Sequence, residues 1–85
     1  MEILNVGYNN FVVKDKVIAI VSSDTKPIKR LISVYKNEAK IIDATSGRKT
    51  RTVIVMQSGY IVLSSIHPQT LSQRMHEKPV ENVQI

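Results

Sequence analysis

The chain has 85 residues, no cysteine and a formal net charge of +5 from 12 basic and 7 acidic side chains. That length fits a single domain with a thin core, and the absence of cysteine excludes disulfides and thiolate metal sites. The longest apolar run, Val17 to Val21, is far shorter than the roughly 20 residues that span a membrane. We therefore expect a cytoplasmic protein with no membrane segment and no signal peptide, which gains buried surface by self-association.

Positive charge is concentrated in one part of the chain. Residues 14–51 hold ten Lys or Arg against four acids, whereas the charges of residues 52–85 cancel. A one-sided basic surface is typical of proteins that bind polyanions, most often nucleic acid, although scattered lysines on a soluble protein give the same totals. Single-strand binders usually stack bases on several aromatic side chains, and this chain has only four. The composition therefore favours contacts to duplex backbone.

The first part of the chain is predicted to form three strands, at residues 3–6, 11–13 and 17–21. Gly7 and Asn9-Asn10 indicate a turn after the first strand, because these residues tolerate left-handed backbone angles. Residues 14–16 are a charged bend. The third strand is β-branched without polar alternation, so we expect it to be buried.

An amphipathic helix is predicted from Pro27 to about Ala39, with capping side chains at residues 22–25. Its apolar stripe consists of Ile28, Leu31, Ile32, Tyr35 and Ala39. Lys36 and Lys40 complement the dipole at its C-terminal end. Lys29 and Arg30 lie at the opposite end, where the dipole does not favour cations. These two are therefore secondary candidates for binding an anion.

Three more strands are predicted at residues 40–45, 51–56 and 60–65, then a short helix from Pro68 to about His76. The predicted class is α+β, with a mostly antiparallel sheet, one main amphipathic helix and a short C-terminal helix. Residues 1–76 form the domain, and residues 77–85 form a tail or an added strand. The last two predicted strands are apolar on both faces, which favours a neighbouring subunit or the second helix as a cover.

No arrangement of residues predicts an enzyme, a metal site, a cofactor or a small-molecule substrate. His67 and His76 have no cysteine near them and are interpreted as structural or surface residues. Asp24 is interpreted as a helix cap and Asp43 as a strand-end or salt-bridge residue, not as a catalytic pair. No nucleophile elbow, phosphate loop or dinucleotide-binding glycine pattern is present.

The stretch from Ser46 to Arg51, here called the cationic loop, contains a glycine and three cations. It is predicted to be the tight turn of a hairpin between the strands on either side. Arginine binds phosphate with two parallel hydrogen bonds and lysine acts as a point charge, so Arg48, Lys49 and Arg51 suit a phosphate. As a bare pattern the signal is weak, because many hairpin tips are basic.

Several short segments together resemble the small bacterial RemA family of extracellular matrix regulatory proteins. They are Leu4-Asn5-Val6-Gly7, Ile18-Ala19-Ile20-Val21-Ser22, Pro27-Ile28-Lys29-Arg30, Ile42-Asp43-Ala44-Thr45, Gly47-Arg48-Lys49-Thr50-Arg51, Val62-Leu63-Ser64 and Pro68-Gln69-Thr70, followed by Gln73-Arg74. The resemblance covers about residues 3 to 75. It implies a cytoplasmic, nucleoid-associated DNA-binding transcription regulator with a LytTR-like fold. It also implies closed homo-oligomeric rings whose outer surface binds double-stranded DNA by avidity, and control of matrix or biofilm genes.

The resemblance places the DNA-binding positions of the family at Lys16, Arg48 and Lys49, with lysine at two positions where the family has arginine. Arg51 supports or joins these three, and Lys29 and Arg30 remain secondary. Two alternatives use the same basic face. One is an RNA- or ribosome-associated factor, and the other is a non-enzymatic oligomeric scaffold that binds an acidic protein or a nucleotide.

Overall fold

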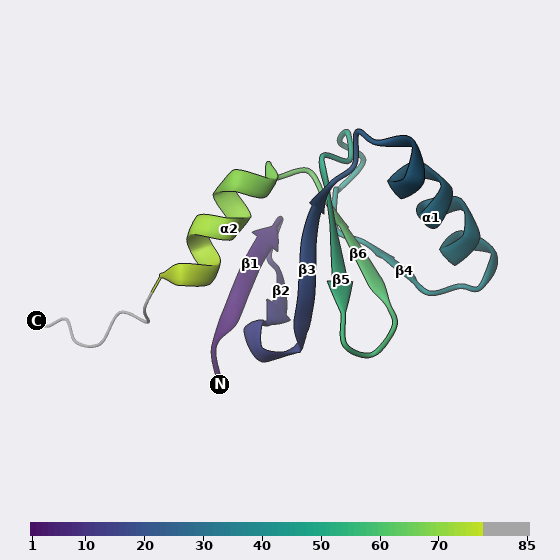
Figure 1. The fold of residues 1–85 in the computed structure, drawn as a ribbon. Coiled ribbons are helices and arrows are strands. Elements are labelled where there is room, and N and C mark those ends of the chain that lie inside the picture. Colours follow the sequence, from purple (N-terminus) through teal and green to yellow (C-terminus); the bar gives the residue numbers. More distant parts are fainter. Residues whose placement is uncertain (78–85) are drawn as a thin grey trace, which may run out of the picture.

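A computed structural model describes residues 1–77 of the chain, and the last eight residues lie outside the described part (Figure 1). Its elements, in order, are β1 (Ile3–Gly7), β2 (Asn10–Val13), the 3-10 helix η1 (Lys14–Lys16), β3 (Val17–Ser22), α1 (Lys26–Asn37), β4 (Ile41–Asp43), β5 (Thr52–Met56), β6 (Ile61–Ser64) and α2 (Pro68–His76). The predicted α+β class with mostly antiparallel strands is confirmed. The predicted tail or strand at residues 77–85 falls almost wholly outside the described residues.

The main sheet has four strands in the order β3-β5-β6-β4. Its strand pairs are antiparallel except β4 with β6, which run parallel, with Ile42 opposite Val62. The prediction of a hairpin around the cationic loop is therefore wrong, because β6 lies between β4 and β5. The physical reason is burial: β5 and β6 are apolar on both faces and take the centre, while short β4 ends in the polar Asp43 at the edge.

The two faces of this sheet carry different layers, which lie on opposite sides of it in Figure 1. The antiparallel β1–β2 ribbon and α2 cover one face, where the buried cluster includes Leu4, Val6, Ile54, Val62 and Leu71. The other face packs against α1, around a buried cluster of Val53, Ile61 and Leu63. The second helix and the ribbon thus cover the face that α1 leaves open, as the apolar strands predicted.

The strand β3 is not the buried strand predicted from its composition. It forms one edge of the sheet, and none of its described residues is fully buried. The side chain of Ile18 is 66 % exposed, beside an irregularity in the pairing of β3 with β5. A run of β-branched residues indicates a strand but not its place in a sheet, so this error could not be corrected from the sequence.

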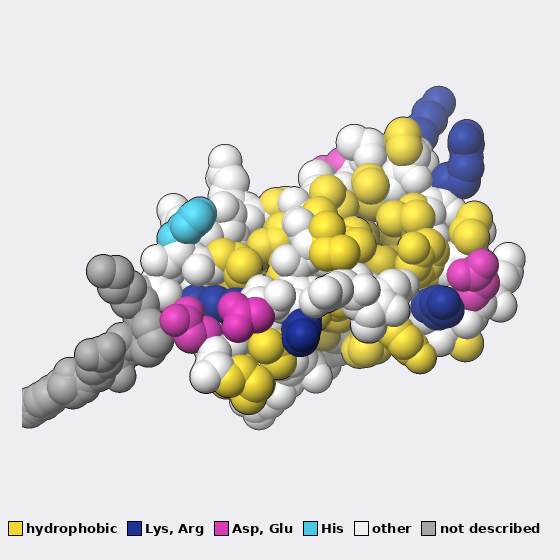
Figure 2. Space-filling view, turned by 60° about the horizontal axis from the view of Figure 1, so that its bottom comes forward, with side chains coloured by type: hydrophobic (Ala, Val, Ile, Leu, Met, Phe, Trp, Pro, Cys, Tyr) yellow, Lys and Arg dark blue, Asp and Glu magenta, His cyan; other side chains and the backbone are white. Residues whose placement is uncertain are grey.

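The helix α1 begins one residue earlier and ends two residues earlier than predicted. Thr25 occupies the N-cap position without a side-chain cap hydrogen bond, so Asp24 is not the cap. Ala39 has a φ of 56° and lies beyond the helix end. Among the described residues of α1, none is fully buried although its apolar stripe faces the sheet. Figure 2 shows apolar side chains gathered in a broad patch that extends toward this helix.

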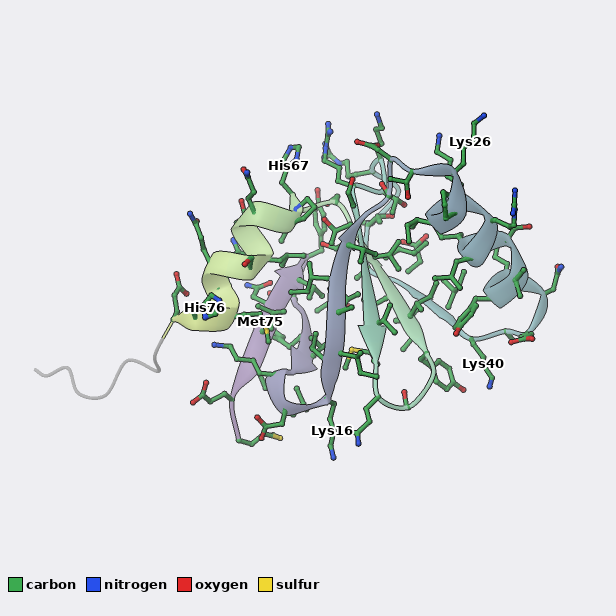
Figure 3. All side chains as sticks on the ribbon, in the orientation of Figure 1. Lys16, Lys26, Lys40, His67, Met75 and His76 are labelled. Atoms are coloured by element: carbon green, nitrogen blue, oxygen red, sulfur yellow. The ribbon has the colours of Figure 1, made fainter. Side chains whose placement is uncertain are left out.

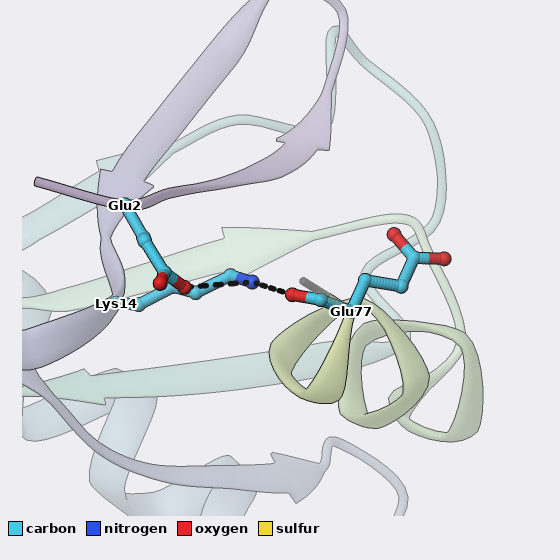
Figure 4. A network of polar contacts seen from close by, with 3 residues as sticks. All are labelled: Glu2, Lys14 and Glu77. Atoms are coloured by element: carbon cyan, nitrogen blue, oxygen red, sulfur yellow. Dashed lines mark hydrogen bonds and ion pairs between the residues drawn. The ribbon is translucent and has the colours of Figure 1, made fainter. Parts of the chain in front are cut away.

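The helix α2 is fixed to the first strand by polar contacts (Figure 4). The Lys14 ammonium lies 3.6 Å from a Glu2 carboxylate oxygen and donates a 3.0 Å hydrogen bond to the Glu77 carbonyl. The Arg74 guanidinium donates a 3.0 Å bond to the Asn5 carbonyl. These cations serve the fold. Neither helix within residues 1–77 is long and apolar enough to cross a bilayer.

Candidate phosphate-binding site

The cationic loop starts with a tight turn that the sequence supports residue by residue. Ser46 and Gly47 have φ angles of 53° and 79°, and the Arg48 amide donates a 3.0 Å bond to the Thr45 carbonyl. Two successive positive φ angles define a type I′ turn, which favours glycine. A methyl group built on Gly47 would meet no atom within 4 Å. Glycine is therefore favoured here by its positive backbone angle and not by crowding.

A carboxylate fixes the entry to this turn. One oxygen of Asp43 accepts hydrogen bonds from the Thr45 hydroxyl at 2.6 Å and from the Thr45 amide at 2.9 Å. These bonds, the hydroxyl first, hold the pKa of Asp43 below its ordinary value, and Lys36 lowers it further while partial burial opposes the change. Asp43 is therefore the strand-end residue that the sequence offered as one of two roles, and within residues 1–77 it forms no salt bridge. Its bonds to Thr45 order the start of the loop.

Two serines fix the rest of the loop to the ends of neighbouring strands. The Ser23 hydroxyl donates a 2.8 Å bond to the Thr50 carbonyl, and the Ser23 amide donates a 3.1 Å bond to the Arg51 carbonyl. The Arg51 amide donates a 2.9 Å bond to the Ser64 carbonyl. The backbone is thus bonded to the ends of β3 and β6, and the loop offers its cations from a fixed frame.

The three cations of the loop converge on one concave site of about 300 Å³. Its lining residues come from the β1–β2 turn, the loop and the end of β6: Tyr8, Arg48, Lys49, Arg51 and Ser65. All three cations are exposed, whereas Thr50 is half-buried. The three cationic side chains therefore converge, as expected for a turn, and do not alternate between two sides as they would along a strand. Guanidinium, ammonium and hydroxyl groups around one hollow are the donors that a phosphate requires.

These cations have no carboxylate partner in the described part of the chain. The one ion pair within residues 1–77 joins Lys14 to Glu2, at the far end of β1 from Tyr8. Lys14 and Arg74 line a larger cavity, of about 520 Å³, but both are bonded to the protein itself. Like charges around one hollow repel each other, so an anion bound there is favoured. This contrast identifies the loop as the candidate site.

The other predicted cations do not join the loop within one chain. Lys16 lies at the opposite end of the sheet, where its carbonyl accepts a 2.7 Å bond from the Gln57 amide (Figure 3). Lys29 and Arg30 are exposed on the first turns of α1. Figure 3 shows Lys26, which the sequence reasoning passed over, at the end of the sheet opposite Lys16. Lys26 starts α1 three residues after Ser23, so it belongs to the same end as the loop.

Sequence reasoning also missed Tyr8 and Ser65. Neither belongs to a periodic pattern. Tyr8 reaches the site through the packing of β1 against β6, and Ser65 through the pairing of β5 with β6. An aromatic residue between Gly7 and Asn9, in a turn where apolar side chains gain little burial, was the available signal for Tyr8. His67 and His76 are both exposed, and residues 1–77 contain no group of three metal-binding side chains.

Comparison with known proteins now adds to this geometry. The family model described as "RemA-like: Extracellular matrix regulatory protein A-like" matches residues 3–75. The chain belongs to this family. A protein of Dictyoglomus turgidum named "Putative regulatory protein" is 49 % identical over 75 residues, which cover 88 % of each chain. Proteins of the same name are 47 % identical in Fervidobacterium nodosum, over 93 % of this chain and 85 % of the relative, and 39 % identical in Acetivibrio thermocellus, over 100 % and 91 %.

The RemA-like match confirms the resemblance read from the short segments of the sequence. It covers β1 through most of α2, and so includes both the cationic loop and Tyr8. The names of these relatives are those of regulatory proteins, not of enzymes. The RemA-like chain is therefore assigned to a family of regulators.

Proposed function

We propose that this chain is a DNA-binding transcription regulator that binds the phosphates of double-stranded DNA through its cationic loop. The observation that carries the proposal is the site of about 300 Å³ that three cations line without a carboxylate partner in residues 1–77. The proposal includes a single LytTR-like domain, a cytoplasmic and nucleoid-associated location, and control of matrix or biofilm genes. No catalytic step, cofactor or small-molecule substrate is part of it.

We further propose that copies of the chain assemble into a closed ring that presents many loops on its outer surface. The apolar stripe of α1 stays half-exposed in a single chain, and Ile18 and Ile42 are exposed on the two edge strands. Within residues 1–77 neither edge pairs with a further strand, and the two edges lie on opposite sides of the sheet. Different surfaces on opposite sides suit head-to-tail contacts, which close into rings. Avidity then adds weak contacts together.

Assembly also allows Lys16 to contact DNA, which it cannot do together with the loop of its own chain. Lys16 is exposed at the end of the sheet away from the loop. In a ring, the Lys16 side chains of successive copies form a second cationic row at that end and contact the DNA there, while Arg51 supports Arg48 and Lys49 within each loop. Lys29 and Arg30 contribute long-range attraction from α1.

The test of DNA binding is the salt dependence of affinity for a 30-base-pair duplex. Wild type and Arg48→Ala/Lys49→Ala are compared by fluorescence anisotropy at several salt concentrations. Each lost phosphate contact should reduce the slope of log affinity against log salt by about 0.9. The control is Lys36→Ala/Lys40→Ala, which removes the same charge from the end of α1 and the residues after it and should retain the wild-type slope.

Equal slopes for the loop variant and wild type would remove the loop from the DNA-binding site. Structured RNA is added as a competitor in the same assay, because an RNA-associated factor would prefer it to the duplex. A scaffold for an acidic protein would bind neither nucleic acid at moderate salt. Light scattering after size exclusion tests assembly: a ring gives several times the 9.6 kDa chain mass, and a clean monomer at micromolar concentration rejects it.

A further inference from the structure

The site at the cationic loop has a wall that is not cationic. Tyr8 comes from the turn between β1 and β2, forty residues before Arg48 in the chain, yet lines the same hollow. Its side chain is 51 % exposed and belongs to neither buried cluster. Core packing therefore does not account for an aromatic residue at this position.

The backbone holds Tyr8 in a conformation that a tyrosine rarely adopts. Tyr8 and Asn9 have φ angles of 53° and 64°, and Gly7 before them has a φ of 110°. The Asn10 side-chain amide donates to the carbonyls of Gly7 and Tyr8 at 2.9 and 3.2 Å, while the Asn5 side-chain oxygen accepts from the Gly7 amide at 2.8 Å. These bonds offset the strain, and strain maintained in this way marks candidate functional positions.

Both walls of the hollow are attached to the same residue. The Ser64 hydroxyl donates a 2.8 Å bond to the Val6 carbonyl in β1, and the Ser64 carbonyl accepts the Arg51 amide at 2.9 Å. Ser64 itself is fully buried. A methyl group built on Gly7 would lie 3.3 Å from Ile66, so the β1–β2 turn also sits tightly on the end of the sheet. The backbone of Tyr8 is thus fixed relative to the backbone of the cationic loop before any ligand binds.

We propose that Tyr8 is a further DNA-contact residue, whose hydroxyl donates a hydrogen bond to a backbone phosphate oxygen held by the cationic loop. The ring packs against the neighbouring deoxyribose. This inference rests on the proposed function and names a contact that is neutral where the others are charged. The Lys49 ammonium attracts a phosphate with little directional preference, whereas a hydroxyl hydrogen bond is directional and comes from a turn whose backbone is fixed, so Tyr8 sets the register of the duplex on the loop.

A neutral contact has a signature that separates it from the cations. It releases no counterion, so its loss lowers affinity without changing the salt slope. Tyr8→Phe removes only the hydroxyl and keeps the ring. Affinity for the 30-base-pair duplex should fall about tenfold at each salt concentration, with the slope of wild type, because a hydrogen bond to a charged group contributes about that factor.

The matched control is Tyr60→Phe, which removes a hydroxyl from a 41 % exposed tyrosine at the β5–β6 turn, on the other end of the sheet. It should bind as wild type does. Equal affinity of Tyr8→Phe and wild type would overturn the role of the hydroxyl, and would do so even where Tyr8→Ala binds weakly, since that pattern indicates packing of the ring alone. If the wild-type chain binds no duplex, both the proposed function and this contact are wrong. If wild type shows the expected salt dependence of affinity and Tyr8→Phe binds equally well, only the Tyr8 contact is wrong.

Discussion

The two faces of the four-stranded sheet are covered to different degrees. Toward β1 and α2, Leu4, Ile54 and Leu71 are fully buried. Toward α1, full burial is confined to strand residues, and the helix side chains against them, such as Ile32, stay half-exposed. The first face is the core of a finished domain, and the second leaves apolar surface exposed, as the proposed interface requires. We therefore expect stability to depend on the first face and assembly on the second.

A charge on the outer side of α1 should have the largest effect. Val34 is 47 % exposed on α1, so Val34→Glu leaves the buried clusters intact but places a carboxylate on the proposed interface. The mass measured by light scattering should fall from several times 9.6 kDa to that of one chain. Ile3→Glu, at a 51 % exposed position in β1, is the matched control and should keep the wild-type mass. A reversed result would exchange the roles of the two faces.

Truncation of an apolar side chain should change the free energy of unfolding differently on the two faces of the sheet. Leu71→Ala removes a fully buried side chain and should lower the free energy of unfolding by about 2–5 kcal/mol in urea titrations. That loss should be the same at low and high protein concentration. Ile32→Ala should cost less in dilute protein, and its cost should grow with concentration because assembly completes its burial. If the loss in free energy of unfolding for Ile32→Ala does not depend on protein concentration, the α1 face is not an interface.

Ser64→Ala should weaken both the core and the candidate site. The Ser64 hydroxyl donates to the Val6 carbonyl and accepts from the Ile66 amide at 3.1 Å, so its removal leaves buried groups unpaired. The free energy of unfolding should fall by about 1–3 kcal/mol, and affinity for the duplex should fall too. Ser33→Ala, on the exposed side of α1, is the control and should change unfolding by less than about 0.5 kcal/mol.

The smallest effect should be a pH dependence from Asp43, on the α1 side of the sheet. Its folded pKa is lowered below the ordinary value of 3.8, chiefly by the Thr45 hydroxyl. A lowered folded pKa gives stability that is present above the unfolded pKa and is lost as pH falls through the folded pKa. Melting temperatures measured from pH 7 to pH 2 should therefore fall less steeply for Asp43→Asn than for wild type. Parallel curves would show that these bonds do not favour the ionised form.

Local signals in the sequence predicted the local structure well. The bounds of α2 follow from Pro68, which suits a first helical turn, and from the apolar pair Leu71 and Met75. The turn at Gly47 and the convergence of three cations were also predictable, because a glycine and closely spaced cations act within a few residues. The α+β class followed from the order of such elements.

Non-local choices could not be predicted in the same way. Nothing local to β4 indicates that β6, about twenty residues later, will lie beside it and exclude β5. The exposure of Ile18 depends on β3 being an edge strand, which only the competition among all strands decides. Tyr8 joins the site through the Ser64 bonds to β1 and to the loop, a tertiary relation without a sequence pattern.

The parallel pairing of β4 with β6 determines how charge can be repeated along an assembly. Both edge strands, β3 and β4, run in the same direction and end on the side of the cationic loop. A rotation that brings the β3 edge of one copy to the β4 edge of the next keeps every strand direction unchanged. Successive loops then point the same way, one subunit width apart. In the proposed ring, a bound duplex would meet a periodic row of positive charge, and its own helical repeat would decide how many phosphates coincide with that period.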